Sequence, residues 1–141
     1  MTQTEILEFF AKRDDAWQRH DSMTLAAGHA EDGEVDSPFF GIVKGRSAIE
    51  NTYRQWFLSF PDAEYRTEHL LISGDRAAQF TRMSGTQKGD FCGLSPTGKR
   101  FEMRCAFLFF IADGQIVNEI RTYDFIRVLL QLGVLKAKPA H

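Results

Sequence analysis

The sequence predicts an α+β fold, with a curved antiparallel sheet wrapped over a long first helix. Helical spacing of apolar residues dominates the first part of the chain, whereas from Tyr65 onward the segments are rich in β-branched and aromatic residues. Helical spacing returns only after Asp124. Helices first and strands afterwards are typical of α+β proteins. The length of 141 residues fits a single domain, 1–141, with an ordered core at about 5–135.

The chain begins with two helical patterns. Residues 4–20 carry apolar side chains at helical spacing, with charged residues between them and Thr4 as the expected N-cap. A short second helix, 22–29, follows Asp21. The chain then turns into a brief strand that ends near Pro38. We expect the first helix to present an amphipathic face to the rest of the fold.

A third helix is predicted over residues 47–59. Gly45 breaks the preceding pattern, and Ser47 with Glu50 three residues later has the spacing of a capping box. Pro61 ends the helix, because proline lacks the backbone N–H that a helix interior needs.

Strand patterns fill the second half of the chain, separated by the turn-forming segments SGD, SPTG and ADG. The ADG segment, residues 112–114, is a strong signal for a hairpin between the last two strands. After Asp124, FIRVLLQLG predicts a helix that ends at a left-handed Gly133. The terminal KAKPAH is expected to be mobile. The strand patterns are EYRTEHLLIS, RAAQFTRMSGTQKGDF, KRFEMRCAFLFFI and QIVNEIRTYD.

Charge and composition exclude several functions. The formal net charge is −2 and no block of five like charges occurs, so the chain lacks the basic surface that nucleic-acid binding needs. No apolar run is long enough to span a bilayer, and the N-terminus lacks the pattern of a signal peptide, so we expect a cytoplasmic location. Two cysteines are too few for a disulfide framework. Thirteen phenylalanines can instead fill a core or line an apolar cavity.

Four segments in order carry a family resemblance. They are AEDGEVDSP, KGRSAIE, GTQKGDFCGLSPTGKRFE and DGQIVNEIRTYDFIRVLLQLG. From about residue 5 to 135 the chain resembles the SnoaL-like polyketide cyclase, or ester cyclase, branch of the nuclear transport factor 2-like superfamily. The resemblance implies a cone-shaped α+β barrel with a deep apolar pocket between sheet and helices, and frequently a homodimer. It leaves the chemistry open, because this fold hosts many activities.

The resemblance also implies candidate residues. SnoaL-like cyclases rely on an acid at the position of Asp124, which takes and returns a proton during ring closure without metal or organic cofactor. Their usual neighbours differ here, with Gln87 in place of a histidine and Ile120 in place of a tryptophan. Ketosteroid isomerases place their catalytic groups where this chain has Arg13, Ser37 and Ala106, none of which can do that work.

Limonene-type epoxide hydrolases offer a second enzymatic interpretation. Their Asp-Arg-Asp arrangement falls on Asp90, Lys88 and Asp124. Two acids are kept, but lysine cannot bridge two carboxylates as the planar guanidinium does. The groups that hold water in those hydrolases fall on Val35 and Ser37. A solvated turn is the alternative interpretation for Lys88 and Asp90.

Asp124 can also be assessed without the family. If the last strand is regular from 116 to 124, Ile120, Thr122 and Asp124 share one mostly apolar or uncharged face, and a carboxylate there is a usable proton carrier. Arg104 is in phase with the apolar residues of the neighbouring strand and can point into the same cavity. Asp124 is equally well explained as the N-cap of the final helix, so both interpretations stay open.

The sequence therefore predicts a pocket for a hydrophobic small molecule. The favoured function is general acid/base chemistry by Asp124, the second is epoxide hydrolysis, and the third is a non-catalytic binding or dimerisation module, which the missing partner residues favour. The expected catalytic residues are Asp124, Asp90 and Arg104, and those expected to contact the ligand are Trp17, Ser37, Trp56, Met103, Ile120 and Thr122.

Overall fold

The computed structural model describes residues 1–136, and the expectation for the terminal segment falls mostly outside them. Within that range the chain alternates between helices and strands as an α+β fold, which confirms the predicted class. None of the helices within residues 1–136 is long and apolar enough to cross a membrane. The elements are α1 Gln3–Gln18, α2 Ser22–Ala27, β1 His29–Ser37, β2 Gly41–Lys44, α3 Arg46–Ser59, β3 Glu64–Ser73, β4 Arg76–Thr86, β5 Arg100–Ala112, β6 Gln115–Thr122 and α4 Phe125–Gln131.

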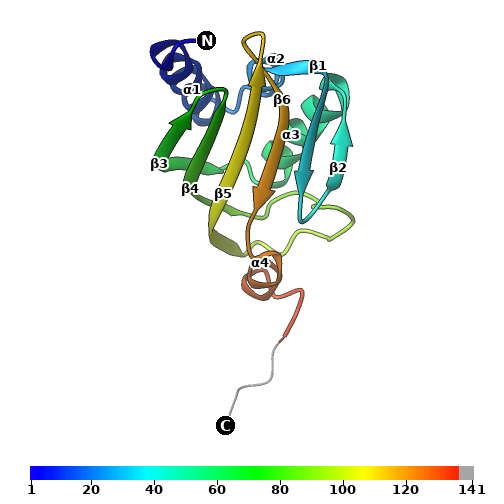
Figure 1. Ribbon diagram of the computed structural model, residues 1–141. Coiled ribbons are helices and arrows are strands. Elements are labelled where there is room, and N and C mark those ends of the chain that lie inside the picture. The colour runs from blue at the N-terminus through cyan, green and yellow to red at the C-terminus, as the bar shows by residue number, and fades with distance from the viewer. Residues whose placement is uncertain (137–141) are drawn as a thin grey trace.

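The strands form one mixed sheet in the order β2-β1-β6-β5-β4-β3. All neighbours are antiparallel except β1 and β6, which run parallel. The sheet curves, with α1, α2 and α3 on its inner side, whereas α4 lies beyond the end of β6 (Figure 1). The predicted hairpin joins β5 and β6, where Asp113 and Gly114 both have positive φ, as a two-residue type I′ turn requires.

β5 shows how the sequence pattern builds the inner face. Its burial alternates along the strand, because successive side chains point to opposite sides of the sheet. The buried set consists of apolar residues that pack against the helices. Phe109, for example, makes an edge-to-face contact with Phe10 of α1 at 4.9 Å between ring centroids. The inward-facing residues are Phe101, Met103, Cys105, Phe107, Phe109 and Ile111.

β6 departs from regular alternation at its first residues. Ile111 of β5 pairs with Ile116, whereas the preceding Phe110 pairs with Asn118, so Val117 is an extra residue in β6. This bulge reverses the phase of the strand. Ile116 is fully buried, but beyond the bulge the buried residue is Glu119.

Two details of the local predictions were wrong, and one strand was not predicted. The capping box of α1 uses Thr2 and Glu5 rather than Thr4. The predicted capping box of α3 does not form, because the helix begins directly after Gly45, which has φ of 94° and makes no side-chain cap. The short edge strand β2 was not foreseen. The predicted end of α4 is confirmed, since Gly133 has φ of 75° and Val134 donates to the carbonyl of Leu129.

Candidate functional site

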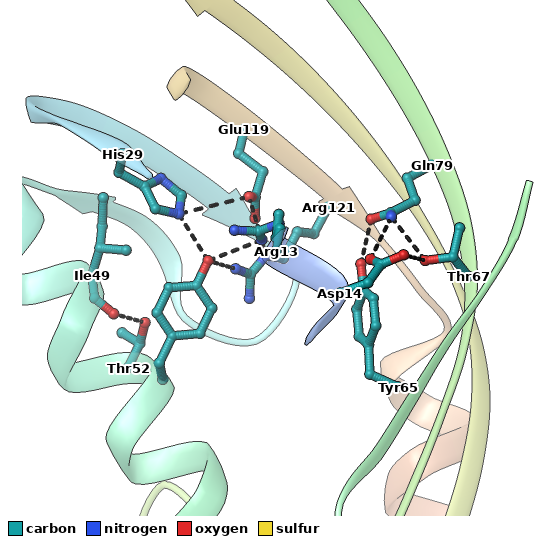
Figure 2. Close-up of polar contacts among 11 residues, drawn as sticks. Arg13, Asp14, His29, Ile49, Thr52, Tyr65, Thr67, Gln79, Glu119 and Arg121 are labelled. Carbon is teal, nitrogen blue, oxygen red and sulfur yellow. Dashed lines mark hydrogen bonds and ion pairs between the residues drawn. The ribbon is translucent and has the colours of Figure 1, made fainter. Parts of the chain in front are cut away.

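A buried polar network lies where α1, α3, β1 and β6 meet. Its centre is the hydroxyl of Tyr53, which lies 3.0 Å from Nη2 of Arg13, 3.2 Å from Nη2 of Arg121 and 2.8 Å from Nε2 of His29. Glu119 joins both cations, because Oε1 accepts from Arg13 at 3.0 Å and Oε2 accepts from Nε of Arg121. Figure 2 shows the side chains of Arg13, His29, Glu119 and Arg121 converging from α1, β1 and β6. The hydrogen bond from Arg13 to Glu119 connects two residues that lie 106 positions apart in the sequence.

The hydrogen-bond donors fix the proton positions in this network. A guanidinium only donates, so the Tyr53 oxygen accepts from Arg13 and Arg121, and its own proton goes to Nε2 of His29. His29 is therefore a neutral imidazole with its proton on Nδ1. Burial, reinforced by Arg13 and Arg121, lowers the pKa of His29 to about 3 despite the opposing effect of Glu119.

Glu119 is the only carboxylate bonded to the two arginines among residues 1–136. Burial by itself raises the pKa of a carboxyl group, but Arg121 and Arg13 outweigh it and hold the pKa of Glu119 at about 2. The pKa of Arg121 is raised in turn, because Glu119 and Tyr53 overcome the effect of burial. Two guanidinium groups therefore share one carboxylate.

A small cavity adjoins this network between the helices and the inner face of the sheet. The space open to the centre of a water molecule is about 20 Å³, room for roughly one water. The walls are mainly aromatic or sulfur-containing, and Arg121 brings a charged group to them. The lining residues are Trp17, Phe40, Thr52, Tyr53, Trp56, Met83, Met103, Cys105, Phe107, Arg121 and Tyr123.

The cavity walls carry hydrogen-bond donors that lack acceptors. The indole N–H groups of Trp17 and Trp56 are buried and have no partner in the part of the chain that the structure describes. Arg121 uses Nε and Nη2 for Glu119 and Tyr53, and its Nη1 makes no hydrogen bond to residues 1–136. Buried polar groups normally find partners. The two indole N–H groups are therefore available to an acceptor oxygen, although Nε of Arg13, Nδ1 of His29 and Oγ1 of Thr81 are also buried without a partner within residues 1–136.

A second polar cluster supports the cavity from the other side of α1. Asp14 accepts hydrogen bonds from Thr67 at 3.0 Å and from Gln79 at 3.1 Å, and Tyr65 donates to the Gln79 side chain (Figure 2). Burial raises the pKa of Asp14 even though both bonds oppose it. The Tyr65 ring stacks on Trp17 with centroids 4.5 Å apart. The cluster thus fixes one wall of the cavity.

Several predicted contact residues lie at this cavity. Trp17, Trp56 and Met103 line it. Ser37 is buried nearby at the end of β1, where its Oγ accepts from the backbone N–H of Phe40 at 3.2 Å. Ser37 therefore shapes the turn that carries Phe40 to the cavity wall.

The predicted face of β6 was wrong. Ile120, Thr122 and Asp124 are exposed on the outer side of the sheet, because the bulge at Val117 reverses the regular alternation on which the prediction relied. Glu119 and Arg121 take the inner positions instead.

Arg104 and Asp124 both lie on the outer side of the sheet. The prediction that they share one side was right, but the prediction that this side faces the inner cavity was wrong. Both line an open groove of about 510 Å³ with Arg82, Arg127 and Gln131. Asp124 caps α4, and its Oδ1 accepts from the Arg127 backbone N–H at 3.0 Å.

The proposed hydrolase residues lie in the loop between β4 and β5. Lys88 and Asp90 are both exposed and line neither the cavity nor the outer groove. The side-chain amide of the buried Gln87 holds this loop by donating to the carbonyls of Leu94 and Ser95, each at 3.1 Å. The structure therefore does not bring Lys88 and Asp90 to the cavity that Trp17 and Trp56 line.

Comparison with known proteins is consistent with this architecture. The sequence pattern of the SnoaL-like polyketide cyclase family matches residues 8–132. The chain belongs to the SnoaL-like polyketide cyclase family. No curated protein matches it by sequence.

Solved structures show the same fold as this SnoaL-like chain. A candidate SnoaL-like polyketide cyclase from Jannaschia is 21% identical with a TM-score of 0.84, covering 94% of each chain. IdmH of Streptomyces antibioticus, a candidate polyketide cyclase, is 25% identical with a TM-score of 0.74, covering 89% of this chain and 96% of IdmH. An NTF2-like protein from Burkholderia thailandensis is 25% identical with a TM-score of 0.75, covering 89% of this chain and 95% of its own.

The buried network of this SnoaL-like chain was missed by the sequence reasoning. Arg13 was predicted only to be unable to do the work of an isomerase residue, and no pattern in the sequence indicated that it would pair with Glu119. One signal was present: Glu119 and Arg121 are opposite charges two residues apart, on the same face of a strand that also carries Ile116 and Ile120. Charges on a central strand that pair with each other indicate a buried polar site.

Proposed function

We propose that this protein is a small-molecule enzyme of the cyclase or isomerase type that uses the inner cavity. Arg121 and the indole N–H groups of Trp17 and Trp56 hold an oxygen atom on which negative charge develops. The observation that carries the proposal is the guanidinium of Arg121, fixed at the cavity wall by Glu119 and Tyr53 with Nη1 unused. No metal or organic cofactor is required for this role.

The chemistry follows from donors fixed in a desolvated site. Once a carbon next to the substrate carbonyl has lost its proton to solvent water, ring closure or isomerisation passes through an enolate-like transition state, and donors held in place before the reaction stabilise that charge more strongly than water does. The aromatic walls suit an apolar or ring-bearing substrate. Since the cavity holds about one water, the substrate enters by moving wall side chains apart.

Tyr123 offers a further donor beside Arg121. Burial raises the pKa of Tyr123 to about 12, so the phenol stays protonated at neutral pH and can give a hydrogen bond to the reacting oxygen. No carboxylate among residues 1–136 lines the cavity. The walls therefore supply electrophilic stabilisation rather than a strong base.

The lack of a base favours a second candidate function, a binding module that holds a hydrophobic ligand without turnover. The role of Asp124 as general acid/base has only its offset in the family as support, because its carboxylate is exposed and caps α4. Epoxide hydrolysis by Asp90, Lys88 and Asp124 has equally little support. The expected homodimer stays a prediction.

A turnover assay on lactones, esters, ketones and epoxides separates these functions. With a substrate that is turned over, Arg121→Gln should lower kcat/KM by about a hundredfold or more, as expected for the loss of one oxyanion donor. Asp124→Asn should leave it within about threefold of the unmodified protein, because an N-cap is retained. Arg104→Gln is the matched control, since it removes an arginine from the opposite side of the same sheet.

Two results would overturn the proposal. If Asp124→Asn abolishes turnover and Arg121→Gln does not, the chemistry belongs to the outer groove. If no substrate is turned over but ligands bind in the cavity, the binding-module function holds instead. Circular dichroism of each variant checks that it is folded, and Arg121→Lys keeps the charge while losing the planar fork.

A further inference from the structure

We infer that the ligand of the inner cavity is an anion, a carboxylate or an ionised enol or phenol attached to an apolar body. The inference rests on the proposed use of this cavity and adds the charge of its ligand. The observation that supports it is an excess of positive charge in the buried network. Arg13 and Arg121 are two cations with one bonded carboxylate, Glu119.

Arg13 and Glu119 are shielded from solvent, and Arg121 is mostly shielded. The side chains of Arg13, Arg121 and Glu119 are 3%, 13% and 0% exposed. His29 adds no charge, because its pKa of about 3 keeps it neutral. Tyr53 adds none either, since burial raises the pKa of its hydroxyl. The network therefore carries one uncompensated positive charge.

The neighbouring acid Asp14 offsets this charge only in part, since burial raises the pKa of Asp14 and Arg13 opposes that rise without pairing with it. Asp14 follows Arg13 in α1, but its carboxylate oxygens accept from Thr67 and Gln79, and it forms no ion pair with Arg13. Further compensation is weak and comes from aromatic rings near both arginines. The Arg121 guanidinium lies 5.4 Å from the ring centre of Tyr53 and 5.5 Å from that of Phe107, which reduces the cost of burial without neutralising the charge.

An unpaired charge inside a protein is costly unless something pairs with it. Arg121 is the charged member of the network that lines the cavity, and its Nη1 makes no hydrogen bond within residues 1–136. Trp17 and Trp56, whose N–H groups are unpartnered within residues 1–136, line the same cavity. Three donors, one of them cationic, match the two oxygens of a carboxylate or the single oxygen of an enolate.

Phenylpropionate and phenylpropionamide test this inference directly, because they have nearly the same shape and differ in charge. Intrinsic fluorescence reports their binding, since the two tryptophans of the chain both line the cavity. We expect the carboxylate to bind at least about tenfold more tightly than the amide, the difference between a charged and a neutral hydrogen bond. In Arg121→Gln the two should bind within about threefold, and Arg104→Gln should preserve the preference.

The outcomes separate this inference from the proposed function. Equal binding of the two probes to the unmodified protein overturns the anionic ligand, while a loss of turnover in Arg121→Gln would still support the enzyme. A fluorescence response to neither probe at millimolar concentration also overturns it, because an uncompensated cation at an apolar wall should take up an apolar carboxylate. A preference that survives Arg121→Gln assigns the anion to another cation and contradicts the inference as well.

Discussion

Replacing Glu119 by glutamine tests the buried network most severely. The carboxylate accepts from Arg13 and Arg121, and its side chain is fully buried. An amide keeps the shape but turns an N–H donor toward one of two guanidinium groups, which also only donate. The substitution thus removes the negative charge that separates two buried cations.

Two arguments give the size of the effect. Breaking a buried ion pair by removing one partner typically costs about 3–5 kcal/mol. The ionised state of Glu119 gives a similar figure, because the difference between its ordinary pKa of 4.5 and about 2 in the folded protein corresponds to about 3 kcal/mol. We therefore expect the free energy of unfolding to fall by about 3–5 kcal/mol at pH 7.

Urea denaturation followed by circular dichroism measures this loss, and Glu102→Gln is the matched control. Glu102 pairs with Arg82 at the same 3.0 Å that separates Glu119 from Arg13, but its side chain is 55% exposed. An exposed pair contributes at most about 1 kcal/mol. If Glu119→Gln costs no more than Glu102→Gln, the charged network does not support the fold and the reasoning fails.

The remaining predictions concern acidity, capping and close packing. Because the pKa of His29 is about 3 in the folded protein and 6.5 ordinarily, the unfolded state binds more protons between these values, so stability should fall as pH drops from 6.5 toward 3. The urea midpoint should vary less across that pH range in His29→Gln than in the unmodified protein. The same pH dependence in both proteins would contradict the low pKa of His29. Asp124→Ala should cost about 1 kcal/mol through the lost N-cap, whereas Asp124→Asn should cost only a few tenths, and equal losses in thermal melts would refute a capping role. Gly89→Ala should destabilise by about 1–3 kcal/mol, because its Cβ would lie 2.6 Å from the Leu58 carbonyl oxygen, and an unchanged melting temperature would show that the loop yields freely.

The sequence was sufficient for the architecture because the main elements follow local rules. The β5–β6 hairpin follows from residues that accept positive φ, and β5 alternates strictly between buried and exposed residues. Capping was less predictable. The Ser47–Glu50 pattern is a valid local signal, but the Gly45 N–H donates to the Gly33 carbonyl at 2.8 Å and fixes where the helix begins. Tertiary contact therefore decided that boundary.

The candidate site could not be read from the sequence for a different reason. One extra residue, Val117, decides which face of β6 meets the helices, and every side chain beyond it changes sides. The lining by Trp17 and Trp56 was predictable because large aromatic residues on amphipathic helices turn inward. The pairing of Arg13 with Glu119 was not, since it joins segments 106 residues apart.

The central claim is that ligands bind the inner cavity rather than the outer groove. Proton–nitrogen correlation NMR tests it with phenylpropionate as ligand. The indole N–H signals of Trp17 and Trp56 report the cavity, and the backbone amide of Arg127, which donates to Asp124, reports the groove. We predict that both indole signals shift and the Arg127 amide does not. A shift of the Arg127 amide with unmoved indole signals would contradict the claim.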